Sequence, residues 1–401
     1  MTLARLAWTH LWAKPLAALL NLLLLMLGFA AISLVLLVSE QLEDGMRRDL
    51  AGIDLVVGAK GSPMQLILAG VFHLDVPPGN IPLSAVATLK QHPLVARVVP
   101  ISLGDTLRGY RIVGTTPDYA ALYAAKHSTG RDWGKPLEAV LGSEVATATG
   151  LKTGDSFAGS HGLGATGHLH GDTPYTVVGI YGRTGTVLDR LVLTSTESVW
   201  AVHERATATD AEDLKAMAEE REVTMLLVSY RSPLAAVSLP RWVNAQAELQ
   251  AASPALETAR LLRMVGIGID VLKGFGAVLL FVAGLSVFIA LYHAVREREN
   301  DLAMMRMLGA PPRRVAALVG LEALWLATLG AILGIAFGHG LTHVLGLSLK
   351  AERSVSLSGT LWSVWEWSIP ALAFVLALAS SALPVWRAYR LDVTRLLQAP
   401  R

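Results

Sequence analysis

Three histidines lie close together in a glycine-rich stretch of this 401-residue sequence, GSHGLGATGHLHGD. They are His161, His168 and His170, and Asp172 follows two residues after the last of them. Neutral imidazole suits Zn²⁺, and three histidines with a carboxylate or a water would complete a tetrahedral site. The glycines make the stretch flexible, which favours capture and release of a metal over a rigid structural site. The alternative is a solvated loop whose histidines bind nothing.

A second pair of histidines, His339 and His343, lies four residues apart in an apolar segment. On a helix this spacing places both side chains on one side, where two imidazoles can hold a metal ion. Hydrogen-bonded or solvated imidazoles near a membrane interface are the alternative. No H-E-x-x-H, G-x-S-x-G or G-x-x-x-x-G-K-[ST] motif occurs, which argues against the common zinc-protease, serine-hydrolase and P-loop ATPase sites.

One carboxylate, Glu322, lies inside the same apolar segment. It follows Arg314 by eight residues, which is about 12 Å along a helix. A charged group at that depth needs a protein interior or water, so it is either a proton-linked or gating group or a carboxyl group bonded to a neighbouring helix. Gly330, Gly334 and Gly338 recur every four residues and would form a smooth face for close helix packing. The packed helix would belong either to the same chain or to a second copy.

The elements that carry these residues are those of a membrane protein. The chain is 53% hydrophobic and only 16% charged, which is too apolar for a purely soluble protein. Its formal net charge of +2 and the lack of a basic patch with aromatic residues argue against nucleic-acid binding. The absence of cysteine excludes disulfides and thiolate metal sites. Four segments are long enough to cross a bilayer as helices: residues 15–39, 274–295, 315–346 and 367–386.

Basic residues predict the orientation of these spans. They are concentrated in residues 1–14, in the loop 296–314 and in the tail 387–401. By the positive-inside rule these three segments are cytoplasmic, so both termini face the cytoplasm. Residues 1–14 are expected to form an amphipathic helix on the inner membrane surface. Residues 40–273 and the short loop 347–366 then lie on the outer side.

The outer segment has a mixed pattern. Six short β-branched or apolar runs bounded by turns predict strands: DLVVG, VARVVPIS, YRIVGTT, YTVVGIYG, RLVLT and VTMLLVSY. Helical patterns occur at Leu83–Gln91 and Pro240–Ala251, and long apolar helices at both ends form stalks. A smaller inserted subdomain is expected at 104–185. The predicted fold is therefore membrane α-helical, with four transmembrane helices and a large α+β extracytoplasmic domain between the first and second helices.

The loop between the second and third spans, RERENDLAMMRMLGAPPRRV, is the most charged stretch of the chain. Leu302, Met305 and Leu308 are expected on one face of a helix of about ten residues. Gly309 stands where a glycine ends a helix, and Pro311–Pro312 prevent its continuation. Such a helix can dock in a groove of a cytoplasmic partner. The alternative is a loop whose arginines only fix the orientation of the spans.

The order of one span, a large external domain and three clustered spans resembles the MacB/FtsX-like family of ABC transporter permeases (type VII ABC transmembrane subunits). The loop sequence REREN-D-LAMMRMLGA and residues 138–155 and 384–397 are also similar to that family. The resemblance implies a multi-pass permease of the bacterial inner membrane that has no motor of its own. Two copies, as a homodimer, would pair with two copies of a separate ATPase that binds ATP. It assigns ATPase coupling to six residues: Arg298, Asp301, Leu302, Met305, Arg306 and Gly309.

Residues 54–83, DLVVGAKGSPMQLILAGVFHLDVPPGNIPL, resemble a subgroup of the family that is linked to bacterial zinc acquisition. The resemblance implies mechanotransmission, in which ATP hydrolysis moves the periplasmic domain, in the service of zinc uptake or handling. The implied partners are a periplasmic metal-binding or accessory protein and membrane lipid. The alternatives are a permease for export of lipoproteins or small molecules, and a regulator of cell-wall hydrolases.

Overall fold

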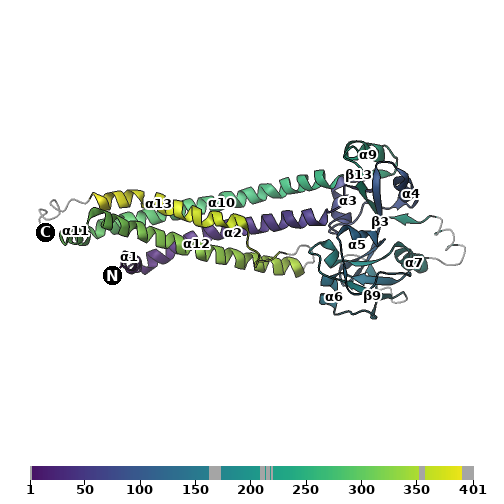
Figure 1. Cartoon of the computed structure of the whole chain (residues 1–401), viewed down its shortest axis with the longest axis horizontal. Coiled ribbons are helices and arrows are strands. Elements are labelled where there is room, and N and C mark those ends of the chain that lie inside the picture. Colours follow the sequence, from purple (N-terminus) through teal and green to yellow (C-terminus); the bar gives the residue numbers. More distant parts are fainter. Residues whose placement is uncertain are drawn as a thin grey trace. The chain divides into compact units, whose positions relative to one another are not determined.

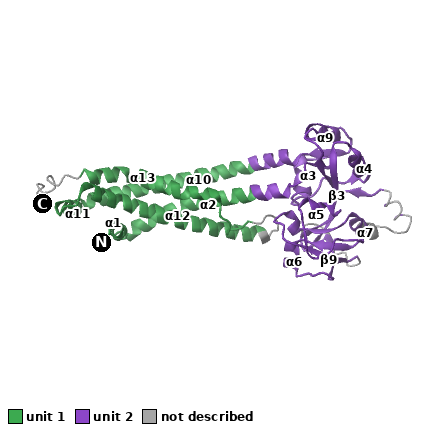
Figure 2. Ribbon diagram, viewed as in Figure 1, with its two compact units in different colours: residues 1–42, 264–401 green, residues 43–263 purple. Residues whose placement is uncertain are grey.

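The computed structural model describes residues 2–161, 173–207, 213, 217, 220–351 and 357–390. The chain divides into two compact units, one formed by residues 1–42 and 264–401 and the other by residues 43–263. Figure 2 shows these units in different colours. They are called the helical unit and the sheet unit below.

The helical unit contains mostly apolar helices. Among the described helices, four are long and apolar enough to cross a membrane, which confirms the predicted number. α10 has 44 residues, about 66 Å at the usual rise, more than twice the ~30 Å apolar core of a bilayer. The helices, of which all but η2 are labelled in Figure 1, are α1 (Leu3–Leu11), α2 (Pro15–Asp49), α10 (Pro254–Glu297), α11 (Glu299–Met307), α12 (Pro312–Ala351), the 3₁₀ helix η2 (Val364–Trp367) and α13 (Ser368–Tyr389).

The N-terminal helix α1 packs against α12, a contact that the expected position on the membrane surface does not include. Ala7 is fully buried, and its small side chain allows the two helices to approach closely. The rings of Trp8 and Trp325 meet edge to face with centroids 5.3 Å apart. The indole Nε1 of Trp325 also donates to the carbonyl oxygen of Ala4 at 3.3 Å. These contacts tie α1 to the third long helix.

The three regularly spaced glycines of α12 face α2. A Cβ built on Gly330, Gly334 or Gly338 would lie 2.6, 2.5 or 2.7 Å from the nearest side-chain atom of α2. Those distances are shorter than real Cβ contacts, so only glycine permits this helix separation. The partner helix, which the sequence left open, therefore belongs to the same chain.

The sheet unit is built on a mixed sheet with eleven strands among the described residues. Its main path is β13-β1-β12-β3-β4-β10-β6-β9-β5, with β7 on β9 and β8 on β3, while β2 and β11 form a separate pair. β4 and β10 are parallel, as are β6 and β9. The strands are β1 (Leu55–Ala59), β2 (Ile81–Pro82), β3 (Val95–Leu107), β4 (Tyr110–Thr115), β5 (His127–Gly130), β6 (Glu138–Leu141), β7 (Ser156–Phe157), β8 (Ser160–His161), β9 (Tyr175–Tyr181), β10 (Val192–Ser195), β11 (Glu222–Val223), β12 (Met225–Tyr230) and β13 (Leu249–Ala252).

Two hydrophobic clusters form the core of the sheet unit. One contains Leu226 and Leu239, the other contains Leu141 and Val177, and the long strand β3 contributes residues to both. Short helices complete the unit: α3 (Pro63–Gly70), α4 (Ser84–Gln91), α5 (Asp118–Leu122), α6 (Ser143–Thr149), η1 (Val187–Arg190), α7 (Thr196–Thr207) and α9 (Ala235–Asn244). The α+β class predicted for this segment is confirmed.

The six strands predicted from sequence runs are all present, as β1, β3, β4, β9, β10 and β12. The helix expected over Pro240–Ala251 is wrong in its second half, because α9 ends at Asn244 and Leu249–Ala252 form β13. The Oδ1 atom of Asn244 accepts from the backbone N–H of Ala251 at 2.8 Å. This bond closes the turn that returns the chain as an edge strand beside β1.

Candidate functional site

The charged loop forms the short helix α11, which lies between α10 and α12 in the chain. Glu299 and Asp301 occupy its first turn and Arg306 its last, so their charges complement the helix dipole. Asp301 is exposed and Arg306 half-buried. Gly309 follows at φ +97°, a conformation that L side chains rarely adopt, and α12 begins at Pro312. The glycine and proline therefore end one helix and start the next within a few residues.

The two faces of α11 differ in burial. Leu302 is buried and Met305 half-buried against the helical core. Met304 and Met307 are each 51% exposed and Leu308 is 89% exposed. Leu308 was expected on the same face as Leu302, but it is the residue that caps the end of the helix and its side chain is exposed. The apolar tip, defined as Met304, Met307 and Leu308, is therefore uncovered by the described residues.

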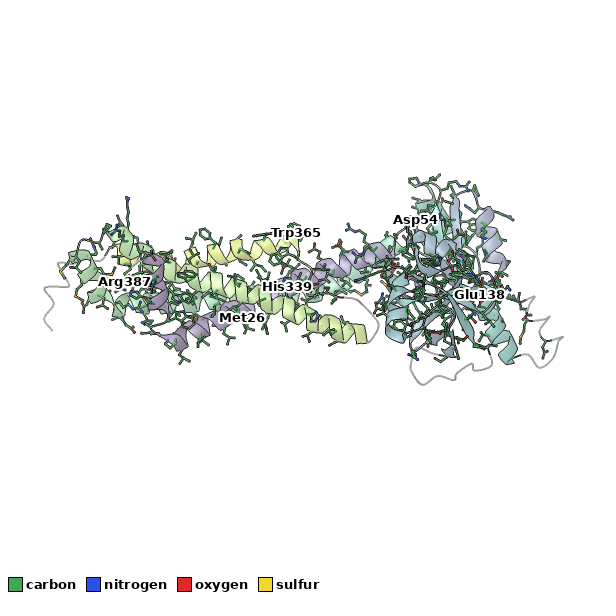
Figure 3. The ribbon with its side chains drawn as sticks, turned by 60° about the horizontal axis from the view of Figure 1, so that its bottom comes forward. Met26, Asp54, Glu138, His339, Trp365 and Arg387 are labelled. Atoms are coloured by element: carbon green, nitrogen blue, oxygen red, sulfur yellow. The ribbon has the colours of Figure 1, made fainter. Side chains whose placement is uncertain are left out.

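Two ion pairs hold the start of α11, or the end of α10 directly before it, to other parts of the helical unit. Lys14, just before α2, pairs with Glu297 at the end of α10. Arg387 of α13 donates to Glu299 at 2.9 Å and to the hydroxyl of Tyr292 at 2.6 Å. Figure 3 shows Arg387 at the opposite end of α13 from Trp365. The entry to α11 is thus braced by α2, α10 and α13.

A third contact is more deeply buried. Glu322 of α12 is only 5% exposed, and its Oε1 lies 3.4 Å from Nη1 of Arg298, the residue before α11. The same Oε1 lies 3.3 Å from Nδ1 of His10 on α1. Arg298 also donates from Nη2 to the carbonyl oxygen of His10 at 3.1 Å. Burial and the Arg298 charge lower the pKa of His10. Glu322 is therefore paired with protein groups.

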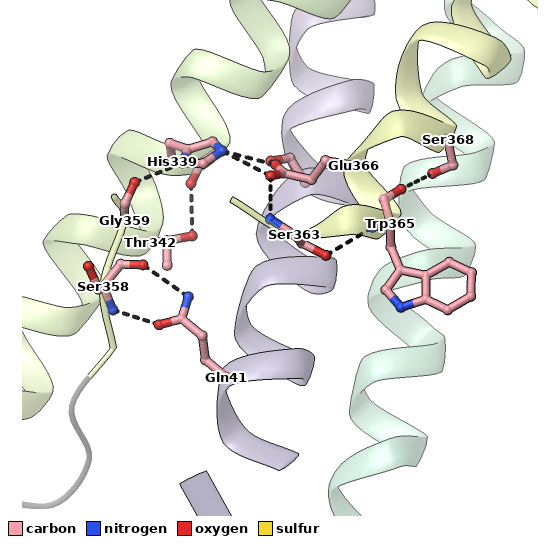
Figure 4. A network of polar contacts seen from close by, with 11 residues as sticks. Gln41, His339, Thr342, Ser358, Gly359, Ser363, Trp365, Glu366 and Ser368 are labelled. Atoms are coloured by element: carbon pink, nitrogen blue, oxygen red, sulfur yellow. Dashed lines mark hydrogen bonds and ion pairs between the residues drawn. The ribbon is translucent and has the colours of Figure 1, made fainter. Parts of the chain in front are cut away.

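A second polar network surrounds Glu366, near the start of α13, and is drawn in Figure 4. This carboxylate is 0% exposed. It accepts from the hydroxyl of Ser33 on α2 at 2.6 Å and from the backbone N–H of Ser363 at 3.2 Å. Nε2 of His339 lies 3.0 Å from it, and Nδ1 of His339 lies 2.7 Å from the carbonyl oxygen of Gly359. The network joins α2, α12 and the segment before α13.

The two histidines of α12 therefore lie in different surroundings. Both ring nitrogens of His339 face protein oxygens, whereas His343 is exposed. A metal at this pair would have to displace one of the His339 hydrogen bonds. Among the described residues no group of three or more histidine, aspartate or glutamate side chains is placed to hold a metal ion.

Sequence reasoning missed Glu366 and its partners, although a signal was present. Ser363 and Glu366 are spaced as in a capping box, and both reciprocal hydrogen bonds of that motif are made at η2. A further two-point contact joins Gln41 of α2 to the backbone of Ser358, at 2.9 and 2.8 Å. The segment 357–367 is thus fastened to α2 and α12 at two points.

The outer histidine cluster is described only at its start. The backbone of His161 lies in β8, where it pairs with Asp105 of β3. Asp105 is buried. His168, His170 and Asp172 lie outside the described residues. The strand register therefore places the backbone of Asp105 opposite that of the first histidine of the cluster.

Two family models match this chain. A model described as MacB-like periplasmic core domain matches residues 18–237, more than half of the chain. A model described as FtsX-like permease C-terminal matches residues 273–393. The ABC transporter permease YtrF of Bacillus subtilis (strain 168) is 23% identical over 84 residues. That stretch covers 21% of this chain and only 19% of the length of the relative.

Two solved structures are also similar. The periplasmic region of MacB from Actinobacillus actinomycetemcomitans is 12% identical, with a TM-score of 0.35, and the match covers 53% of this chain and 95% of that one. The extracellular domain of the noncanonic ABC-type transporter YknZ from Gram-positive bacteria is 13% identical, with a TM-score of 0.31. That match covers 50% of this chain and 99% of the other.

Proposed function

Because this chain belongs to the MacB/FtsX-like family of ABC transporter permeases, we propose that it converts ATP hydrolysis by a separate cytoplasmic ATPase into movement of its extracytoplasmic domain. The family is a permease component, which is not itself catalytic, and it implies association with an ATPase subunit. The apolar tip of α11 carries the proposal. Met304, Met307 and Leu308 are exposed on a short helix between two spans, an arrangement that fits a groove on a partner protein.

The surroundings of the tip support docking to a protein. Arg313 and Arg314 are exposed just beyond it, so the apolar side chains have a charged rim, as specific interfaces do. The ion pairs at the start of α11 attach the helix to its neighbours, so a force applied at the tip would reach several spans. A loop that only fixed membrane orientation would need the arginines but neither the exposed methionines nor these braces.

Copurification with the ATPase tests the docking assignment. We expect Met304→Glu and Leu308→Glu each to weaken retention of the ATPase at least tenfold, because a charge would be buried in an apolar contact. Leu234→Glu is the matched control, since Leu234 is also exposed but lies directly before α9 of the sheet unit. Retention of the ATPase by both tip variants at the level of the control would refute the assignment.

We place both termini and α11 in the cytoplasm and the sheet unit in the periplasm, with the spans in the inner membrane, because the basic residues lie on that side. A second copy of the chain is proposed to pack along α10. Its exposed apolar residues recur at intervals of three, four or seven positions, as in a coiled-coil seam: Met264, Ile267, Val271, Val278, Leu285 and Ile289. The first three precede the predicted span, where lipid chains would not cover them.

Cysteine cross-linking tests this dimer. Because the chain has no cysteine of its own, a disulfide can form only at the introduced position. Val271→Cys on the proposed seam should form an intermolecular disulfide in membranes under mild oxidation. Lys273→Cys is the control, since Lys273 is similarly exposed but lies about 200° around the helix from Val271. Equal cross-linking at the two positions would argue against a seam on this face.

Zinc uptake or handling is the process we propose for this system, with a periplasmic metal-binding or accessory protein as its further partner. The observation in favour is that an acidic residue, Asp105 of β3, is the backbone partner of His161, the first histidine of the cluster. Calorimetry of the full chain with Zn²⁺ tests it. Replacing His161, His168 and His170 by alanine should abolish the binding heat, and equal heat in both proteins would remove the metal site.

Growth of a deletion strain separates zinc handling from the alternatives. Slow growth under zinc chelation, restored by added zinc, would favour zinc handling. Cell chaining would favour a regulator of cell-wall hydrolases, and mislocalised lipoproteins or retained small molecules would favour export.

A further inference from the structure

We propose that Glu322 is the positioning residue through which movement of α11 reaches α12 and α1. This inference rests on the proposed function, because it supplies a route from the docked helix into the spans. The docking surface itself does not use Glu322, which is buried on α12, whereas the tip residues are exposed on α11.

The contact made by Arg298 joins the start of α11 to two other helices, α12 and α1. Arg298, which precedes the first residue of α11, approaches Glu322 with Nη1 at 3.4 Å and donates from Nη2 to the His10 carbonyl oxygen at 3.1 Å. One guanidinium therefore engages a carboxylate of α12 and the backbone of α1 together. Because the guanidinium is planar and rigid, displacing α11 must either displace both helices or break both contacts. Figure 1 shows α1 and α11 at the same end of the helical unit.

Burial distinguishes this contact from the other two braces. Both side chains of the Lys14–Glu297 pair are more than half exposed, and those of Arg387 and Glu299 are 35% and 26% exposed. Exposed ion pairs contribute about 0–1 kcal/mol and rearrange easily. Glu322 is buried, and separating a buried pair leaves an uncompensated charge, which costs about 3–5 kcal/mol. The Arg298–Glu322 contact is therefore the brace expected to stay closed while α11 moves.

Close packing of α1 and α12 on each other and on α2 would pass the movement of α11 to α2. α1 is fixed to α12 by the Trp8–Trp325 contact and by the hydrogen bond from Trp325 to Ala4. α12 in turn contacts α2 through glycines that leave no free space between the helices. Since close-packed helices transmit displacement with little compression, α1, α12 and α2 should move together when Glu322 is pulled.

The competing explanation is that Glu322 only neutralises the half-buried Arg298. The double substitution Arg298→Met with Glu322→Met separates the two explanations, because it removes both charges and keeps apolar volume. Replacing a buried ion pair by apolar residues is often neutral for stability. The fold should therefore survive while the charged link to α1 and α12 is lost.

The test uses the complete complex with its ATPase in lipid nanodiscs. A spin label is placed on both copies at Leu256→Cys, an exposed position of α10 in a chain that has no other cysteine. Pulsed electron paramagnetic resonance then measures the distance between the labels without nucleotide and with trapped ATP. We expect the double Met variant to bind the ATPase within about twofold of wild type but to lose at least half of the nucleotide-dependent distance change.

Two further variants complete the design. Lys14→Met with Glu297→Met removes an exposed brace and should keep the wild-type distance change. Glu322→Gln keeps the side-chain volume and should also lose at least half of the distance change. This variant replaces the double Met variant in the test if the double Met variant unfolds. A wild-type response in both Glu322 variants would overturn this inference alone. A wild-type chain that fails to retain the ATPase would overturn the proposed function itself.

Discussion

Gly334 of α12 lies so close to Phe29 of α2 that a Cβ added to the glycine would be 2.5 Å from the Cβ of Phe29. The added atom would also be 3.0 Å from the carbonyl oxygen of Met26, so the obstruction includes the backbone of α2. Gly330 and Gly338 approach the same helix. Because no rotamer change can remove a backbone obstruction, this spacing of the two helices depends on glycine.

Gly334→Ala is therefore expected to lower the free energy of unfolding of the helical unit by about 1–3 kcal/mol, the usual cost of overpacking. The control is Gly340→Ala on the same helix, where nothing lies within 4 Å of the added atom. That change should stabilise the helix by about 0.5–1 kcal/mol, because alanine has the higher helix propensity. Denaturation in detergent micelles measures the free energy of unfolding of both variants. Equal effects would show that α2 and α12 are not packed as described.

Glu366→Gln tests the buried network before α13. The amide keeps the size of the side chain but replaces one accepting oxygen by a donor, so Ser33, Ser363 or His339 loses its acceptor. An unsatisfied buried polar group costs about 1–3 kcal/mol, and the free energy of unfolding should fall by that amount. Ser348→Ala is the control, since that exposed hydroxyl bonds only within its own helix. A melting curve unchanged by Glu366→Gln would contradict the network.

The features predicted correctly from the sequence are those with a local signature. The strand at 55–59 and the strand at 225–230 are short apolar runs between turn residues, and both are found in place. The four long helices follow from uninterrupted apolar length. Gly309 follows from its position before two prolines, and its positive φ agrees with a helix-ending role. Each of these features is determined by residues that lie close together in the sequence.

The features that were missed depend on residues far apart in the chain. Ser33 and Glu366 are 333 positions apart, and no periodicity of either segment indicates that they meet. Arg298 and Glu322 were both singled out, but their contact requires the packing of α11 against α12. Leu302 and Leu308 were predicted on one helix face, but Leu302 is buried and Leu308 is exposed. Six residues at about 100° each place the two side chains about 120° apart, so their spacing does not keep them on one face.

His73 gives the sheet unit a predictable loss of stability in acid. Burial, with Arg111 and Arg190 nearby, lowers its pKa to about 3, whereas an unfolded histidine has a pKa of about 6.5. Between these values the unfolded chain binds a proton that the folded chain does not, so stability is complete above about pH 6.5 and falls as the pH falls. Protonation of His73 alone should cost about 2 kcal/mol between pH 7.5 and pH 5. Burial raises the pKa of Asp49 to about 6, so the folded unit binds a proton there over the same range, and this offsets part of the loss.

Urea unfolding of the sheet unit within the full chain, followed at both pH values, measures this loss. His73→Asn should remove the His73 contribution of about 2 kcal/mol, because asparagine does not titrate, so the variant should lose less stability in acid than the wild type. Asparagine also tolerates the left-handed backbone of this position, where φ is +55°. A pH dependence equal to that of the wild type would assign the acid sensitivity to other groups.

Gly309 should set the direction of the apolar tip. Its φ of +97° cannot be adopted by proline, which is fixed near −65°, so Gly309→Pro must redirect the chain directly after Leu308. We expect this variant to lower ATPase stimulation at least tenfold, because the tip would no longer meet its partner. Gly309→Asn is the matched control. Asparagine is among the residues that best tolerate positive φ, and a built Cβ meets no atom within 4 Å, so stimulation should stay within about threefold of wild type. Full stimulation by the proline variant would mean that docking does not depend on the conformation of this turn.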